Sequence, residues 1–277
     1  MPSPQSGVVR RPAVAGQFYP DNPARLKADV EDYIASSEVE PAPGKVEALV
    51  CPHAGYMFSG PTAGYAFARV RGKQPGRVVL LGCSHRYPLR KASVHQHRAF
   101  ESPVGTFPID EDFAKELAGK LGSESPEAHT LEHALEVQLP FVEAAMGVVP
   151  IVPVLFGSPP GNWHIEAGET LAAMLDKDDL VIASTDLSHY QTEEQANAID
   201  ARTIEGVLSK NPAELVRGIQ VSAFSMCGSA ATAAAMACAI ERGAAVSRLL
   251  DYRTSAHASG DYQRVVGYAA ISMEHAS

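Results

Sequence analysis

Cysteine is scarce in this chain of 277 residues, and its four cysteines form no Cys-x-x-Cys pair. A disulfide framework is not expected in a long chain with so few and such widely spaced cysteines. The first residues include Arg10 and Arg11 but no apolar core behind them. We therefore expect no secretory signal, a cytoplasmic location and reduced thiols.

Long apolar runs and basic runs are also missing. No window approaches the roughly 20 apolar residues that a membrane span requires. The chain has 23 basic against 32 acidic residues, a formal net charge of −9, and no stripe of Lys or Arg. Such a surface does not suit a phosphate backbone. We therefore expect neither a membrane nor a nucleic acid as partner.

What the chain does contain is typical of a folded α/β protein. Hydrophobic residues make up 45% and charged residues 20% of the sequence, which is enough for a sizeable core. Short apolar runs alternate with helical patterns, and the chain ends in two consecutive β runs. We predict a single three-layer α/β/α domain over residues 1–277, with a mixed, largely parallel central sheet and a flexible tail at residues 1–8.

Four local predictions go with this fold. They are a break at Gly60 and Pro61 before a helix over residues 62–70, a turn-rich insertion over residues 100–108, a helix over residues 133–146 that Pro140 kinks or starts, and an edge or bulged strand over residues 148–156. The alternation of residues 92–97 places His95 and His97 on an exposed strand.

Three buried strands each end in side chains that can bind a ligand. The runs over residues 46–51, 77–82 and 179–184 lead to His53, to His85, and to Asp186 with His189. Ligands collect outside the carboxyl ends of strands in α/β sheets, because loops can converge there without disturbing the core. For one histidine a structural role is the commoner outcome, but three such ends predict a site.

Cys227 adds a thiol to this set. It stands just before a small-residue helix over residues 228–241, where the helix dipole favours a thiolate. Two imidazoles and a thiolate, with a carboxylate and a third imidazole nearby, suit iron, copper or zinc rather than magnesium or calcium. A transition metal is the leading hypothesis. Cys51 and Cys83 are predicted to be buried apolar residues outside the ligand set.

Two alternatives stay open at this point. Cys227, His189 and Asp186 have the residue types of a cysteine–histidine–carboxylate triad, and the sequence alone does not separate that triad from a metal site. Residues 129–136 hold a second group in which His133 and Glu136 share a helical face. Its expected role is to orient an imidazole through a carboxylate, or else to form a solvated helix start.

Six collinear motifs carry a family resemblance. They are RPAVAGQFY at residues 11–19, PHAGY at 52–56, SH at 84–85, EHALEVQLPF at 132–141, STDLSHY at 184–190 and CG at 227–228. From about residue 10 to the C-terminus the chain resembles the MEMO family, known in bacteria and archaea as protein B of the AmmeMemoRadiSam system. The fold of that family resembles the class III, LigB-type extradiol dioxygenases.

The resemblance implies a set of metal ligands and two partner proteins. It implies that His53, His85 and Cys227 bind iron or copper, and that Asp186 and His189 line the same pocket. A cysteine stands where the dioxygenases have a glutamate, which argues against ring cleavage. Cys83 stands where the family typically has a proline, which adds a thiol near the metal. An AMMECR1-like protein and a radical SAM enzyme are the implied partners.

Two functions follow as expectations. The first is a metalloprotein that performs redox or oxygen-linked chemistry on an unknown small molecule, with His189 and Asp186 moving protons. The second is a non-catalytic module whose cleft binds a peptide or a partner protein, as the resemblance implies for animal members.

Overall fold

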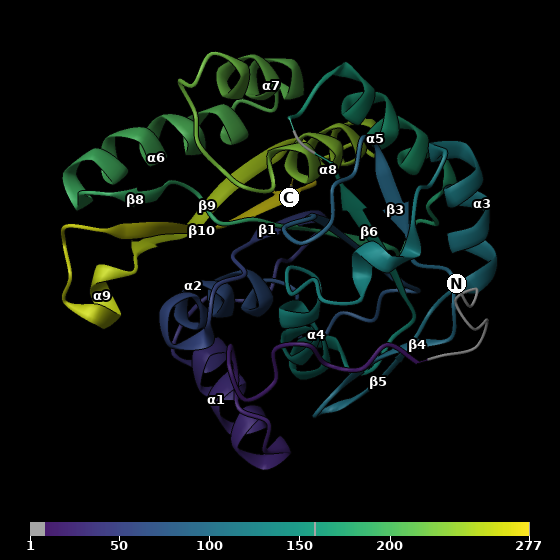
Figure 1. Ribbon diagram of the computed structural model, residues 1–277, viewed down its shortest axis with the longest axis horizontal. Helices are drawn as coiled ribbons and strands as arrows, with labels where there is room; N and C mark the ends of the chain where they lie inside the picture. The colour runs from purple at the N-terminus through teal and green to yellow at the C-terminus, as the bar shows by residue number, and fades with distance from the viewer. Residues whose placement is uncertain (1–8, 158, 277) are drawn as a thin grey trace.

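The structure is a computed structural model that describes residues 9–157 and 159–276 (Figure 1). The predicted flexible tail over residues 1–8 lies outside the described residues, and the domain extent of 1–277 stays a prediction. The strands are β1 (Val46–Cys51), β2 (Val78–Cys83), β3 (Ala92–Val94), β4 (Ala99–Ser102), β5 (Gly105–Pro108), β6 (Ile151–Phe156), β7 (Leu180–Ser184), β8 (His189–Gln191), β9 (Val246–Thr254) and β10 (Val265–Glu274). The α-helices are α1 (Pro23–Ala35), α2 (Tyr56–Ala68), α3 (Glu111–Leu121), α4 (Leu139–Met146), α5 (Asn162–Met174), α6 (Glu193–Leu208), α7 (Pro212–Gln220), α8 (Ser229–Glu241) and α9 (Ala256–Ser259).

A mixed sheet forms the centre of the molecule. Its strands follow the order β3-β6-β2-β7-β1-β10-β8, and β9 also pairs with β10. The four central strands, β6, β2, β7 and β1, are parallel, whereas β3, β10, β9 and β8 pair antiparallel. β1, β2 and β7 are buried along their whole length, as expected for strands covered on both faces. The predicted α/β class and largely parallel centre are confirmed.

Helices cover both faces of this sheet (Figure 1). The small-residue helix α8 packs on β1, β2 and β7, with α5 and α7 against it. On the other face α2 packs on β1 and β10, with α1 and α4 beyond it. The alanines of α8 let the helix approach the strands closely, and eleven of its residues from Ser229 to Ala239 are buried. Two helical layers thus enclose the sheet.

Three local predictions were wrong. α2 begins at Tyr56 and continues through Pro61, because its buried face against α1 and β10 outweighs the hydrogen bond that the proline lacks. Residues 99–108 form the hairpin β4–β5 rather than a turn-rich insertion. β6 is not an edge strand, since the three-residue strand β3 covers it. The Pro153 carbonyl accepts from His95 N just past the end of β3.

The segment after His133 is not one helix. A 3₁₀ turn spans Glu136–Gln138, and α4 begins at Leu139 with Pro140 in its first turn. Pro140 therefore marks a helix start, which was one of its two predicted roles. Glu136 faces away from His133 and binds the N-terminal arm: its carboxylate pairs with Arg10 and accepts from the Tyr19 hydroxyl at 2.6 Å.

Within residues 9–157 and 159–276, no helix has the length and apolar character needed to cross a membrane.

Candidate metal centre

The candidate site lies where the central parallel strands end. β2, β7 and β1 are neighbours and run parallel, so their carboxyl ends reach the same edge of the sheet. His53 follows β1, Cys83 is the last residue of β2, and His85 follows Cys83 by two residues. Asp186 follows β7, and Cys227 comes just before α8. Segments far apart in the sequence therefore meet at one place.

His53 is buried, and hydrogen bonds fix its ring. Its Nδ1 lies 3.0 Å from Ser184 Oγ, and that hydroxyl donates to the Ala134 carbonyl at 2.6 Å. Because the hydroxyl hydrogen is used in this way, Ser184 accepts from Nδ1, and Nε2 is left facing Cys227 Sγ at 3.2 Å. The His53 backbone N–H donates to Asp186 Oδ1 at 2.7 Å, which ties the end of β1 to the end of β7.

His85 is oriented by one carboxylate in a similar way. Glu132 Oε1 lies 2.8 Å from His85 Nδ1, and Glu132 Oε2 accepts from the His85 backbone N–H at 2.6 Å. The other ring nitrogen, Nε2, lies 3.3 Å from Cys83 Sγ. Glu132 also accepts from the backbone N–H groups of His133 and Ala134, both at 3.0 Å, so the carboxylate is held from several sides.

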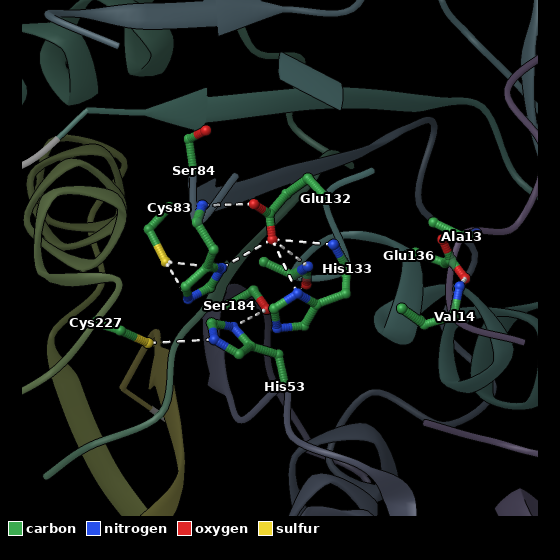
Figure 2. Close-up of polar contacts among 12 residues, drawn as sticks. Ala13, Val14, His53, Cys83, Ser84, Glu132, His133, Glu136, Ser184 and Cys227 are labelled. Atoms are coloured by element: carbon green, nitrogen blue, oxygen red, sulfur yellow. Dashed lines mark hydrogen bonds and ion pairs between the residues drawn. The ribbon is translucent and has the colours of Figure 1, made fainter. Parts of the chain in front are cut away.

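Two nitrogens and two sulfurs thus converge. One ligand atom from each of His53, Cys83, His85 and Cys227 lies within 4.8 Å of each of the others. Figure 2 shows the sulfurs of Cys83 and Cys227 on one side of this group, with Glu132 and His133 on the other. We call these four residues the His/Cys cluster. Soft thiolates and imidazoles are donors that fit iron, copper or zinc, so the residues present suit a transition metal.

The charges of the cluster are complementary. Burial disfavours the charged form of both imidazoles, but Cys227 and Asp186 outweigh it at His53 and raise its pKa to about 9. Cys227 and Glu132 likewise raise the pKa of His85 to about 10. A hydrogen bond with Cys83, together with the charge of His53, holds the pKa of the Cys227 thiol well below its usual range. A metal cation that displaces the imidazole protons would become the positive partner of the thiolate.

The other predicted residues are placed at different depths. Asp186 is buried and lies beside the cluster through its bond to the His53 backbone, and burial raises its pKa. His189 is half-buried on β8, and its Nδ1 lies 2.9 Å from the Leu187 carbonyl. Among the described residues, His189 makes no hydrogen bond with His53, His85 or Cys227. The structure brings the three predicted ligands together and leaves His189 at their margin.

Two further residues lie against the predicted ligands, although neither was predicted to be one. Cys83 was placed outside the ligand set, yet its sulfur belongs to the cluster. His133 stacks on His85 at a ring-centroid distance of 4.6 Å and stands edge-on to His53 at 5.3 Å. Burial and the neighbouring His53 lower the pKa of His133 to about 4, so its ring is neutral at pH 7. Cys83 stands two residues before a histidine, but Cys51 does so as well, so this spacing alone does not identify a ligand.

The carboxylate predicted to orient an imidazole is Glu132. Glu136, which was paired with His133 on a helical face, lies apart from the cluster beside Ala13 and Val14 (Figure 2). The helix on which that pairing depended does not form.

Comparisons with known proteins agree along nearly the whole chain. A family described as "Memo-like protein" matches residues 10–272. A protein of Methanopyrus kandleri described as a MEMO1 family protein is 37% identical, over 95% of this chain and 98% of its own length. A MEMO1 family protein of Methanothermobacter thermautotrophicus is 33% identical, over 96% of this chain and 100% of its own length.

The fold also resembles a solved structure. An uncharacterized protein of Escherichia coli K12 superposes with a TM-score of 0.52 at 15% identity, over 82% of this chain and 99% of the other. At that identity the likeness concerns the fold alone.

Proposed function

This chain belongs to the family of Memo-like proteins, and from that premise we propose that it is a transition-metal protein with redox or oxygen-linked chemistry on a small molecule. His53, His85 and Cys227 are the proposed ligands. One observation carries the proposal: both imidazoles have Nδ1 engaged by an oxygen atom and Nε2 directed at a cysteine sulfur. Histidines that bind metals are typically fixed in this way through their second nitrogen.

The donor set narrows the choice of metal. Imidazole and thiolate are poor ligands for magnesium and calcium, which prefer oxygen. Iron or copper would supply one-electron chemistry at such a site, whereas zinc would supply Lewis-acid chemistry only. We propose iron or copper for the redox function, with zinc as the competing occupant.

Nearby residues are proposed to handle protons. Asp186 uses one carboxylate oxygen to hold the His53 backbone, and the charge of His189 acts on that carboxylate. Because His189 Nδ1 is engaged by the Leu187 carbonyl, Nε2 is the atom left to exchange a proton with a substrate. His133, neutral at pH 7, packs against the two ligand imidazoles without adding a charge.

The proposal is tested by purifying the protein without added metal and without oxygen, and then measuring its metal content and absorption spectrum. We expect stoichiometric iron or copper and a thiolate-to-metal charge-transfer band. Cys227→Ser should lower the intensity of the band, and the pair His53→Ala with His85→Ala should lose the metal. Cys238→Ser is the control, because Cys238 is buried in the middle of α8.

A folded wild-type protein that carries no metal and takes up no added iron, copper or zinc would contradict the proposal. It would instead favour the binding-module function. One observation supports that second candidate: the exposed apolar residues Met57, Leu131 and Tyr190 lie close in sequence to His53, Glu132 and His189, and a peptide or partner protein binds to such side chains. An AMMECR1-like protein and a radical SAM enzyme are the proposed partners to test.

A further inference from the structure

We propose that Cys83 is a fourth protein ligand, so that the His/Cys cluster is a four-coordinate site with two nitrogens and two sulfurs. This inference rests on the proposed function and deepens it, because it changes the number of ligands and the metals that the site prefers.

The spacing of the donor atoms supports a fourth ligand. Metal–nitrogen bonds near 2.0 Å and metal–sulfur bonds near 2.3 Å place nitrogen and sulfur about 3.5 Å apart in a tetrahedral zinc site. Cys83 Sγ lies 3.3 Å from His85 Nε2, and Cys227 Sγ lies 3.2 Å from His53 Nε2. The two nitrogen–sulfur pairs are thus equivalent in separation, and the pair that includes Cys83 is as close to the tetrahedral value as the other.

Hydrogen bonds around the cluster hold the two Nε2 atoms and the two sulfurs in positions that face one another. Glu132 holds His85 Nδ1, and Ser184 holds His53 Nδ1. Neither ring can turn its Nε2 away without breaking one of these bonds. The main chain of Cys227 is held as well, since its N–H donates to the Asp186 carbonyl at 3.1 Å. Cys83 is held by β2, where it pairs with Phe156 of β6.

Cys51 offers a contrast within the same chain. Like Cys83, it is the last residue of a central strand and precedes a histidine by two residues. Its sulfur nevertheless lies in the hydrophobic core, with no exposed surface, and does not belong to the cluster. A cysteine at the end of a central strand therefore need not lie in the cluster, and the position of Cys83 is specific. Cys51 serves as a matched control.

A fourth ligand has two consequences for chemistry. Two thiolates cancel the charge of a divalent cation and favour soft or borderline metals such as zinc, ferrous iron or cuprous copper. Four protein ligands also complete a tetrahedral shell, whereas catalytic zinc sites typically keep one position for water or substrate. Of the two sulfurs, that of Cys227 accepts the Asp186 N–H at 3.2 Å, a contact that stabilises a thiolate there.

The test is an anaerobic titration of the metal-free full-length chain with cobalt(II), followed by visible and near-ultraviolet absorption. Cobalt reports thiolate ligands through charge-transfer intensity and tetrahedral geometry through its d–d bands. We expect one cobalt per chain, with Cys83→Ser and Cys227→Ser each removing about half of the charge-transfer intensity per bound cobalt. Cys51→Ser should leave the spectrum unchanged.

A second variant and a second measurement guard against misfolding. Cys83→Ala is titrated in parallel, circular dichroism checks the fold of every variant, and X-ray absorption of the zinc-loaded wild type counts sulfur neighbours directly. We expect two sulfur neighbours in the wild type. A single sulfur, or undiminished charge-transfer intensity in folded Cys83→Ser and Cys83→Ala, would overturn the fourth ligand while the three-ligand site stands. Failure of the wild type to bind cobalt, zinc, iron or copper at all would instead overturn the proposed function.

Discussion

Glu132 is the residue through which His85 and His133 are coupled. Its carboxylate reaches the His85 ring, the His85 main chain and the His133 main chain. Although burial disfavours its charged form, these bonds and the charge of His85 hold the pKa of Glu132 at about 2. The carboxylate is therefore an anion at pH 7, and its charge makes His85 Nε2 a better electron-pair donor to a metal ion.

We expect Glu132→Gln to weaken metal binding about 10- to 100-fold, because an amide cannot supply the charge that supports His85. Isothermal titration with zinc would measure the change. Glu136→Gln is the control. Glu136 is equally buried but pairs with Arg10, so its loss should cost about 3–5 kcal/mol of stability and leave the affinity of the folded protein intact. Equal affinities in wild type and Glu132→Gln would contradict the assigned role.

Candidate ligand residues could be predicted from the sequence where they directly follow a buried strand. His53, His85 and Cys227 were predicted as ligands because each joins a polar ligand type to the end of a buried strand or the start of a helix, and the structure brings the three together. Cys83 was not found, because a cysteine at the end of an apolar strand is chemically ambiguous. Cys51 has the same sequence pattern and lies in the core. Only the three-dimensional position of the sulfur distinguishes the two.

At the scale of elements, the close contact of α5 with α8 fixes the position of the small-residue helix behind Cys227. Gly168 of α5 makes this contact possible: a Cβ at this position would lie 2.1 Å from the Ala234 carbonyl oxygen. Backbone atoms of a buried helix cannot move aside easily. The helix pair is therefore intolerant of even one added methyl group at Gly168.

We expect Gly168→Ala to lower the free energy of unfolding by about 1–3 kcal/mol through overpacking. Gly119→Ala in α3 should do the opposite. Gly119 is exposed, and a Cβ there meets nothing within 4 Å, so alanine should add about 0.5–1 kcal/mol through helix propensity. Urea denaturation of both variants would measure this. A neutral or stabilising Gly168→Ala would show that α5 and α8 can separate at little cost.

Elements with local signals were predictable, whereas those defined by long-range pairing were not. α6 has Thr192 as a cap with Gln195 three residues later, a local signal that marks where the helix begins. The hairpin β4–β5 was missed because prolines and a glycine within it read as turn signals. The position of β6 inside the sheet depends on β3, a strand of three residues whose sequence could not reveal its partner.

At the scale of the whole molecule, the fold keeps several histidines neutral. His129 is buried, and its ring stands 5.3 Å from that of His95, which was predicted to be at the surface. Burial, together with His95 and the nearby Arg10, lowers the pKa of His129 to about 3. Burial, together with His97 and Arg10, lowers the pKa of His95 to about 4. Each histidine has an ordinary pKa near 6.5 once the chain unfolds.

Stability should therefore fall as the solution becomes acidic. The unfolded chain binds protons at both histidines below about pH 6.5, whereas the folded chain resists protonation until pH 3 to 4. Each histidine contributes stability that is fully present above pH 6.5 and is lost by up to about 1.4 kcal/mol per pH unit below it. Denaturant unfolding of wild type and His129→Gln between pH 7 and 5 would measure the slope. If the free energy of unfolding depended on pH equally in the wild type and in His129→Gln, His129 would have no part in the loss of stability.

His53 and Cys227 lie 174 residues apart in the sequence and 3.2 Å apart in the fold. During synthesis the chain presents His53, Cys83 and His85 long before Cys227 exists, and the pairing that joins them is among the most non-local contacts in the molecule. An early-made segment can therefore hold at most an incomplete ligand set. If the proposed metal binds, the complete ligand set forms late, and a fully bound ion would report that the last third of the chain has reached its place.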